Sequence, residues 1–194
     1  MRYDAFNHNR RSMRLRRYDY TKPGAYFLTI CSYEKECIFG GIVNGEMRLS
    51  EAGVIVLSAW KDLTNHYFHV QLDNFVIMPN HIHGIVILTD TTRYQISENA
   101  AVSHNIPVGA GSEPAPTRVT RRHTLSEIVR SFKTFSARRI NFLRQTPAIP
   151  VWQRNFYDRV VRNKHELHRI RNYIEMNPTN WPQDEENPAN HKTQ

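Results

Sequence analysis

Two apolar segments joined by a very short turn constrain the fold of this chain more than any other feature. HVQLDNFVIMP (69–79) and HIHGIVIL (81–88) are both rich in the β-branched and aromatic residues that favour strands. Only the turn around Pro79 and Asn80 separates them. Because parallel strands need a much longer crossover, these two segments are expected to pair as an antiparallel hairpin.

Three further segments predict extended structure around this hairpin. GAYFLTICS (24–32) is β-branched and aromatic, which is typical of a strand. CIFGGIVNGEMRLS (37–50) contains Asn44-Gly45, a strong signal for a second hairpin. VWQRNFYDRVV (151–161) is expected to be an extended segment at an edge of the sheet.

A first helix is predicted from about Glu51 to His66, because Ser50 is a favourable N-cap residue. Its inward side chains are expected to be Val54, Leu57 and Leu63.

Two more helices are predicted in the second half of the chain. Thr124 and Glu127 have the spacing of a capping box, and the helix that they begin runs to about Leu143. One apolar stripe of this helix consists of Leu125, Ile128, Val129, Phe132, Phe135, Ile140 and Leu143. The last helix runs from about Lys164 to Asn177 and ends before Pro178.

These elements predict one α+β domain over residues 1–181, in which helices cover an antiparallel sheet. The chain has 194 residues, enough for one sizeable core, and no regular βαβ alternation. Residues 89–123 lack periodicity and are expected to be a flexible insertion, with a DNA-contacting flap as the alternative. The polar residues 182–194 are expected to be a disordered tail.

The formal net charge of +8 favours an anionic partner such as nucleic acid. Arginine dominates the basic residues, and its planar guanidinium suits phosphate. The arginines expected to contact DNA are Arg10, Arg11, Arg14, Arg16 and Arg17 in an N-terminal arm, and Arg121, Arg122, Arg154 and Arg169 further on.

No apolar run is long enough to span a bilayer, and the N-terminus does not resemble a signal peptide. Cys31 and Cys37 are expected to be free thiols of a cytoplasmic protein.

His81 and His83 are the residues that most directly predict chemistry. Side chains two positions apart on a strand lie on the same face, about 7 Å apart along the backbone, so the two imidazoles can converge on one metal ion. The alternative is a pair of partly exposed histidines at the start of a strand, near solvent. Two ligands leave a metal site incomplete, so another ligand must come from elsewhere.

The last helix offers the missing groups. Tyr173 and Asn177 are one turn apart on the same helix face, at the edge of an apolar stripe formed by Leu167, Ile170 and Ile174. A hydroxyl nucleophile, a metal that polarises phosphate and a basic surface together indicate a phosphodiester transferase. Tyr157 is a rival nucleophile, but Tyr173 is favoured because only it has a ligand-type residue one turn away.

Several of these segments resemble the REP-associated tyrosine transposases, single-tyrosine HUH transposases of the IS200-like superfamily. PNHIHGIV resembles the His-hydrophobic-His motif of HUH nucleases. NYIEMNPTNW and VWQRNFYDRVVRN resemble the C-terminal signature of the family, and RRSMRLRRYDYTKPGAYFLTICSYEKECIFG and GEMRLSEAG resemble its N-terminal half. The resemblance covers about residues 10–181, apart from 89–123.

The resemblance implies a ferredoxin-like α+β sandwich, the HUH endonuclease fold, and cleavage and joining of single-stranded or hairpin DNA. It implies that His81 and His83 bind Mg²⁺ or Mn²⁺. Asn177 matches the polar residue, glutamine in insertion-sequence relatives, that completes the metal site. Tyr173 matches the nucleophile, which forms a 5′-phosphotyrosine and releases a 3′-hydroxyl.

Two other functions are left open by the sequence. One is a domesticated protein that binds DNA hairpins formed by repeats without cutting them, and the other is a metal-dependent hydrolase that uses bound water. The resemblance also implies a bacterial, cytoplasmic and nucleoid-associated protein. Its relatives include dimers and monomers, so a homodimer is one of two alternatives.

Overall fold

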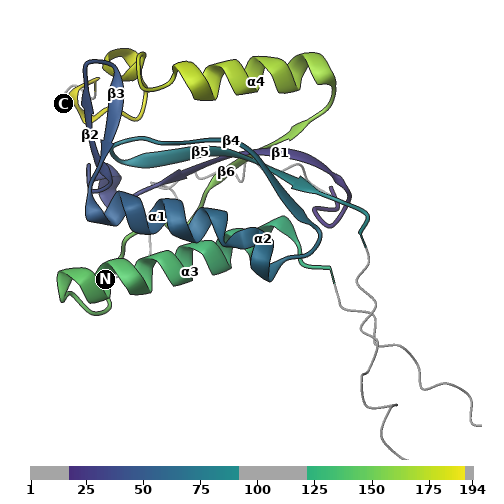
Figure 1. The fold of residues 1–194 in the computed structure, drawn as a ribbon, viewed down its shortest axis with the longest axis horizontal. Helices are drawn as coiled ribbons and strands as arrows, with labels where there is room; N and C mark the ends of the chain where they lie inside the picture. Colours follow the sequence, from purple (N-terminus) through teal and green to yellow (C-terminus); the bar gives the residue numbers. More distant parts are fainter. Residues whose placement is uncertain (1–17, 92–121, 191–194) are drawn as a thin grey trace, which may run out of the picture.

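A four-stranded antiparallel sheet is the centre of the computed structural model, which describes residues 18–91 and 122–190 (Figure 1). The strand order is β4–β5–β1–β6, and every neighbouring pair is antiparallel. The strands are β1 (Gly24–Cys31), β4 (Val70–Ile77), β5 (His81–Leu88) and β6 (Tyr157–Val161). The expected strand at 151–161 is therefore shorter than predicted, and it lies at an edge of the sheet as predicted.

Helices cover both faces of this sheet (Figure 1). One face carries α1 (Glu51–Lys61), the short α2 (Leu63–His66) and α3 (Leu125–Arg144). The other face carries α4 (Lys164–Met176). Counting only the sheet strands, α1 and α3, the chain follows the β-α-β-β-α-β order of ferredoxin-like folds. The predicted α+β sandwich is confirmed.

A separate hairpin is formed by β2 (Gly40–Val43) and β3 (Glu46–Leu49). Its turn is Asn44-Gly45, as predicted, and both residues have positive φ, at 53° and 77°. Two central residues with positive φ are what the tight turn of a two-residue hairpin requires.

The alternation of side chains along β5 separates two cores of different size. Ile82, Val86 and Leu88 point to the α1 and α3 side and belong to the large core. On the α4 side the fully buried apolar cluster of the described residues consists of Phe27, Ile85 and Ile174, with partly buried side chains packed against it. Because this second layer is thin, polar side chains of β5 can remain close to α4.

An ion pair adds to the attachment of α4 to the sheet. The guanidinium of Arg171 donates to both carboxylate oxygens of Asp73, at 2.9 and 2.5 Å. This pairing lowers the pKa of Asp73, mainly through the hydrogen bonds from Arg171. It fixes α4 over the edge strand β4.

Three details of the predicted helices are wrong. The helix expected at 51–66 is divided at Asp62 into α1 and α2. Val54 is 55% exposed, because the buried face of α1 follows Ala52, Val56 and Ala59 instead. Phe135 and Leu143 are also exposed, since the buried line of α3 runs through Ile128, Phe132, Ser136 and Ile140 at four-residue spacing.

The segment after α4 also differs from the expectation. Within residues 182–194, which were expected to be disordered, 182–190 fold against the sheet, with short 3-10 turns at Trp181–Gln183 and Pro188–Asn190. The side-chain amide of Asn80 donates to the carbonyl of Glu186 at 2.7 Å, and Lys35 pairs with the Glu186 carboxylate at 2.9 Å. Residues 191–194, the N-terminal arm up to residue 17 and residues 92–121 of the expected insertion lie outside the described residues.

Two further expectations concern the described part of the chain. Cys31 and Cys37 are free thiols, as predicted. Among residues 18–91 and 122–190, no helix has the length and apolar character needed to cross a membrane.

Gly84 offers a test of how tightly the large core is packed. A β-carbon built at this position would lie 2.5 Å from the indole of Trp60, which stacks on Phe75 at a centroid distance of 4.5 Å. We expect Gly84→Ala to lower the free energy of unfolding by about 1–3 kcal/mol, as overpacked cores do. Urea denaturation measures this change.

Gly41→Ala is the matched control, because a β-carbon added at Gly41 would have no neighbouring atom within 4 Å. Equal stabilities of the two variants would contradict the close packing of Trp60 on β5.

Candidate active site

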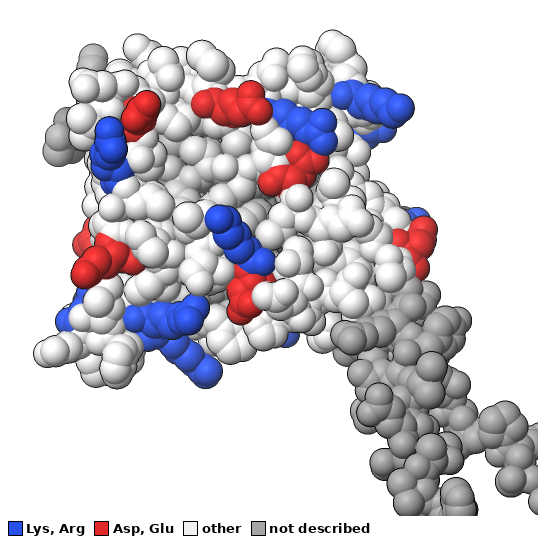
Figure 2. Space-filling view, viewed as in Figure 1, with Lys and Arg blue, Asp and Glu red and all other residues white. Residues whose placement is uncertain are grey.

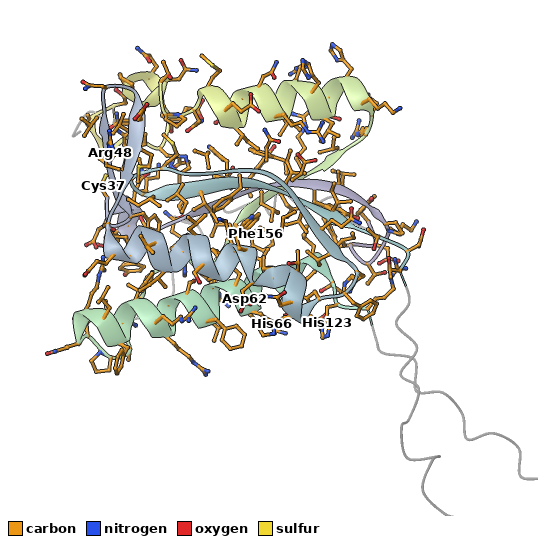
Figure 3. The ribbon with its side chains drawn as sticks, in the orientation of Figure 1. Cys37, Arg48, Asp62, His66, His123 and Phe156 are labelled. Atoms are coloured by element: carbon orange, nitrogen blue, oxygen red, sulfur yellow. The ribbon has the colours of Figure 1, made fainter. Side chains whose placement is uncertain are left out.

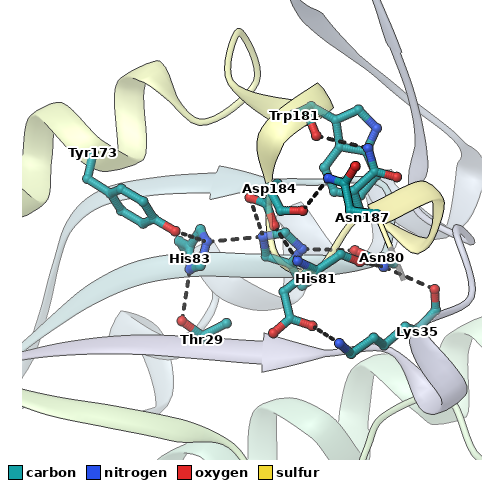
Figure 4. Close-up of polar contacts among 11 residues, drawn as sticks. Thr29, Lys35, Asn80, His81, His83, Tyr173, Trp181, Asp184 and Asn187 are labelled. Atoms are coloured by element: carbon teal, nitrogen blue, oxygen red, sulfur yellow. Dashed lines mark hydrogen bonds and ion pairs between the residues drawn. The ribbon is translucent and has the colours of Figure 1, made fainter. Parts of the chain in front are cut away.

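His81 and His83 lie side by side on the α4 face of β5, with their Nε2 atoms 3.0 Å apart (Figure 4). They are 0% and 3% exposed, so the alternative of partly exposed histidines near solvent is wrong. The folded C-terminal segment provides part of the cover, since the ring of Trp181 lies 6.1 Å from that of His81. The sequence could not show this cover, because it comes from residues about a hundred positions away.

The tautomer of His81 is determined by Asn80, which is fully buried. The Asn80 side-chain nitrogen donates to the carbonyls of Lys35 and Glu186, at 3.0 and 2.7 Å. Its oxygen therefore faces His81 Nδ1 at 2.9 Å and accepts the proton carried there. Nε2 of His81 is left with a lone pair, which is the form that binds metals.

His83 is held in a similar way by the neighbouring strand. Its Nδ1 lies 2.9 Å from the hydroxyl of Thr29, which is its partner across β1. Since His81 Nε2 is an acceptor, a proton or a cation must lie between it and His83 Nε2. Two adjacent ligands about 2.1 Å from an octahedral ion are also about 3.0 Å apart. The spacing of the two nitrogens fits a metal ion.

Burial keeps both imidazoles neutral. It lowers the pKa of His83 to about 3. The pKa of His81 is lowered well below its ordinary value by burial, and by the neighbouring His83 and Lys35. Neutral imidazole is the state in which histidine ligates a metal.

Asp184 is a ligand candidate that the sequence analysis missed. One carboxylate oxygen lies 4.0 Å from His81 Nε2. Suitable ligand atoms of His81, His83 and Asp184 all lie within 4.8 Å of one another, so this group could hold a metal ion. The PQDEENP segment gave no signal of this role, because it has the composition of a disordered tail.

Asn177, the predicted third ligand, lies directly after α4 and is buried. Within the described residues its side-chain oxygen has no hydrogen-bond partner. Burial raises the pKa of both Tyr173 and Asp184, and hydrogen bonds to the Asn177 side chain partly oppose this rise. A buried oxygen with a lone pair to offer, on a side chain that contacts Asp184 and Tyr173, fits an oxygen ligand of a divalent ion.

Tyr173 projects from α4 towards this group. Its hydroxyl lies 3.2 Å from His83 Nε2, and its ring is 6.0 Å from that of Phe27. Burial raises the pKa of Tyr173, and the negative charges of Asp184, Glu185 and Glu186 raise it further. The hydroxyl is therefore protonated at neutral pH, and ionisation needs positive charge nearby.

Tyr157, the rival nucleophile, occupies a different place. Its ring packs edge-on against Phe27, at a centroid distance of 6.3 Å. Among the described residues no hydrogen bond of its hydroxyl to His81 or His83 is present, whereas Tyr173 contacts His83 directly. In this structure all of these groups come from one chain.

The predicted DNA-binding arginines that the structure describes are dispersed. Arg122 donates to the carbonyl of Thr89 and to the Asp90 carboxylate. Arg154 and Arg169 are exposed. On the face in Figure 2, basic side chains lie over both helical layers with acidic ones between them. Those outside the described residues are Arg10, Arg11, Arg14, Arg16, Arg17 and Arg121.

Comparison with known proteins found a close relative and more distant structural similarities. No family model matches the chain. It is 38% identical over 185 residues to an uncharacterized protein of Haemophilus influenzae, with 95% of this chain and 96% of that protein covered.

The solved structure of a REP-associated tyrosine transposase bound to a REP hairpin aligns with a TM-score of 0.53 and 17% identity, covering 86% of this chain and 73% of that chain. A solved structure described as a candidate transposase of Deinococcus radiodurans R1 has a TM-score of 0.44 at 15% identity and covers 84% of this chain and 95% of that chain.

The buried histidines predict how stability depends on pH. In the unfolded chain a histidine titrates near pH 6.5, whereas the pKa of folded His83 is about 3. The unfolded state therefore binds more protons between these values, and stability falls as pH decreases below about 6.5. Each such histidine contributes a slope of about 1.4 kcal/mol per pH unit.

We expect His83→Gln to reduce the slope of unfolding free energy against pH by about 1.4 kcal/mol per pH unit between pH 6 and 4.5, which corresponds to one proton. The free energy of urea unfolding, measured in EDTA, gives the slope for both proteins. His66→Gln is the control, because His66 is exposed on α2. Identical slopes for the parent protein and His83→Gln would show that His83 is not buried in the neutral form.

Proposed function

Since the chain belongs to one family with the Haemophilus influenzae protein and has the fold of the REP-associated tyrosine transposases, we propose that it is a single-stranded DNA endonuclease and strand transferase. It cleaves and rejoins strands at hairpin-forming repeats through a 5′-phosphotyrosine. The structural relative is described in complex with a REP hairpin, which supports a substrate of this kind.

One observation carries this proposal. The hydroxyl of Tyr173 lies 3.2 Å from Nε2 of His83, which itself lies 3.0 Å from Nε2 of His81. A hydroxyl in contact with one of two neutral imidazoles that face each other is poorly explained as core packing. It is well explained as a site where a hydroxyl attacks a phosphate.

In the proposed site His81, His83 and Asp184 hold a divalent ion, Mg²⁺ or Mn²⁺, with Asn177 as a further oxygen ligand. The carboxylate and amide oxygens suit such ions. When bound, the ion supplies positive charge that polarises a non-bridging phosphate oxygen. Asn80 and Thr29 orient the imidazoles through their Nδ1 atoms.

Tyr173 supplies the attacking oxygen. The Tyr173 Oη–P bond forms while the P–O3′ bond breaks, the phenolic proton passes to water, and the departing 3′-oxygen takes up a proton from water. A later attack by a 3′-hydroxyl on the phosphotyrosine reverses these changes and joins strands. One phosphodiester is exchanged for another in each step, so no nucleoside triphosphate is consumed. Phe27 holds the tyrosine ring in position by an edge-on contact.

The basic arm and Arg169 remain predicted DNA contacts. A DNA substrate agrees with a cytoplasmic, nucleoid-associated location in a bacterium. The alternative, a hairpin-binding protein without cleavage, does not need Tyr173 next to His83. A hydrolase that uses bound water would cut without a covalent intermediate.

Substitution of the nucleophile separates these functions. Tyr173→Phe keeps the ring and its packing but lacks the attacking oxygen, so it should still bind a hairpin with a single-stranded flank. It should form no covalent protein–DNA adduct in Mn²⁺, a loss of at least about 10³-fold, whereas Tyr157→Phe should retain the adduct. Denaturing gel electrophoresis and peptide mapping report the linkage.

An adduct on Tyr157, or one still formed by Tyr173→Phe, would show that the nucleophile is misassigned. Cleavage without any adduct would favour the hydrolase, and hairpin binding without cleavage would favour the binding protein.

The ligand set is tested separately from cleavage. Asp184→Asn removes one negative charge from the group and should weaken Mn²⁺ binding by at least about 10-fold, as measured by calorimetry or electron paramagnetic resonance. Glu185→Gln is the control, because Glu185 is the exposed neighbour. If Asp184→Asn binds Mn²⁺ like the control while Asn177→Ala does not, Asn177 and the two histidines form the site without Asp184.

A further inference from the structure

A hollow of about 460 Å³ lies on the other side of the sheet, away from the candidate active site. It is formed by the first half of α3 and the segment that leads into β6. Its lining residues are Thr124, Ser126, Glu127, Val129, Arg130, Lys133, Thr134, Arg154 and Phe156. A volume of this size suits a small-molecule ligand rather than a single ion.

Positive charge dominates the lining. Arg130 and Arg154 are exposed, and Lys133 is half-buried. Glu127 is the one carboxylate among the lining residues, and its Oε2 accepts the N–H of Thr124 in the capping box of α3. The basic side chains of the lining are therefore suited to an anion, and guanidinium groups suit phosphate in particular.

The hollow also has an aromatic wall. Phe156 lies on the side of the sheet that faces α1 and α3 (Figure 3). The ammonium of Lys133 is 5.5 Å from the centre of its ring. Hydroxyl groups of Thr124, Ser126 and Thr134 complete the lining. The lining therefore offers a group for each of the three parts of a nucleotide. The cations can bind phosphate, the hydroxyls can bond to a sugar or phosphate, and a base can stack on the ring.

Lys133 gives this hollow a fixed shape. Its ammonium donates to the backbone carbonyls of Gln153, Arg154 and Asn155, at 2.8, 3.4 and 2.8 Å. These bonds tie the segment before β6 to α3, so that Arg154 and Phe156 are held opposite Arg130. The wall is thus organised before any ligand binds, which reduces the entropy cost of binding.

The hollow lies next to the edge of the sheet. Phe156 packs against the large core, whereas the next residue, Tyr157, packs against Phe27 on the α4 side. A nucleic-acid strand that crosses the edge strand β6 can therefore contact the hollow on one side and the candidate active site on the other.

We propose that this hollow binds one nucleotide unit, with its phosphate at Arg130 and Arg154 and its base against Phe156. The favoured source of the unit is single-stranded DNA, a choice that rests on the proposed function. A free nucleotide has the same chemistry and is the other source.

The experiment measures binding in EDTA, where metal-dependent cleavage cannot occur. A fluorescent oligothymidylate and free thymidine monophosphate are titrated into the parent protein and an Arg130→Ala/Arg154→Ala variant. We expect the variant to bind the oligonucleotide about 10-fold more weakly, with a salt slope smaller by about 0.7 for each arginine. The control is Arg138→Ala/Arg139→Ala, which removes two exposed charges from the same helix outside the hollow.

Stacking is tested by 2-aminopurine placed in the oligonucleotide. Binding to the parent protein should quench its fluorescence, and Phe156→Leu should retain most of the affinity but lose most of the quenching. Leucine keeps the apolar packing of this half-buried position, so the variant should fold.

Each result decides the proposal. Loss of oligonucleotide binding alone in the Arg130→Ala/Arg154→Ala variant identifies DNA as the source, and loss of thymidine monophosphate binding identifies a free nucleotide. If neither ligand distinguishes this variant from the control, the hollow is not a nucleotide site. Failure of the covalent adduct assay would instead overturn the proposed function and leave these binding results intact.

Discussion

The alternation of side chains along β5 is the constraint on which the candidate site depends. One face of this strand supplies Ile82, Val86 and Leu88 to the large core, and the opposite face carries His81 and His83. A shift of one residue in the pairing would exchange the two sets and bury the imidazoles among apolar side chains. The apolar face therefore fixes the register, and the register fixes where the histidines point.

Packing on the α4 side then brings distant polar groups to these histidines. Arg171 joins α4 to Asp73 on β4, which positions Tyr173 and Asn177 at the end of the helix. Asn80 joins the turn before β5 to the carbonyl of Glu186, which keeps Asp184 close to His81. A thin apolar layer with a few specific polar bonds leaves room for a polar centre that a thicker core would exclude.

The two faces of the sheet have complementary electrostatic characters. The α4 side gathers two neutral imidazoles and an aspartate, a group that favours a cation. The hollow beside α3 gathers arginines and a lysine, which favour phosphate. The hollow borders the edge strand β6, whereas the histidines lie on β5, with β1 between β5 and β6. A nucleic-acid strand that needs a metal at one point and phosphate contacts at another would find them on opposite faces of the sheet.

The sequence by itself determined the elements and the chemical types of the central residues. The hairpin at Pro79 and Asn80, the capping box at Thr124 and the stop before Pro178 are local features, because their effects act within a few residues. The strand period put His81 and His83 on one face, and the helix period put Tyr173 beside Asn177. The α+β sandwich followed in the same way from the hairpin and the absence of βαβ units.

Only the tertiary structure decided the burial of the histidines, the place of Asp184 and the hollow beside α3. Residues 182–190 are polar, so composition predicted a disordered tail. They are ordered by bonds to Asn80 and Lys35, about a hundred or more positions earlier in the chain. Val54 and Phe135 were placed in the core because periodicity identifies an apolar face but not how wide the contact with the sheet is. Contacts between segments far apart in the chain have no local signal, and these contacts convert a pair of histidines on a strand into a candidate catalytic site.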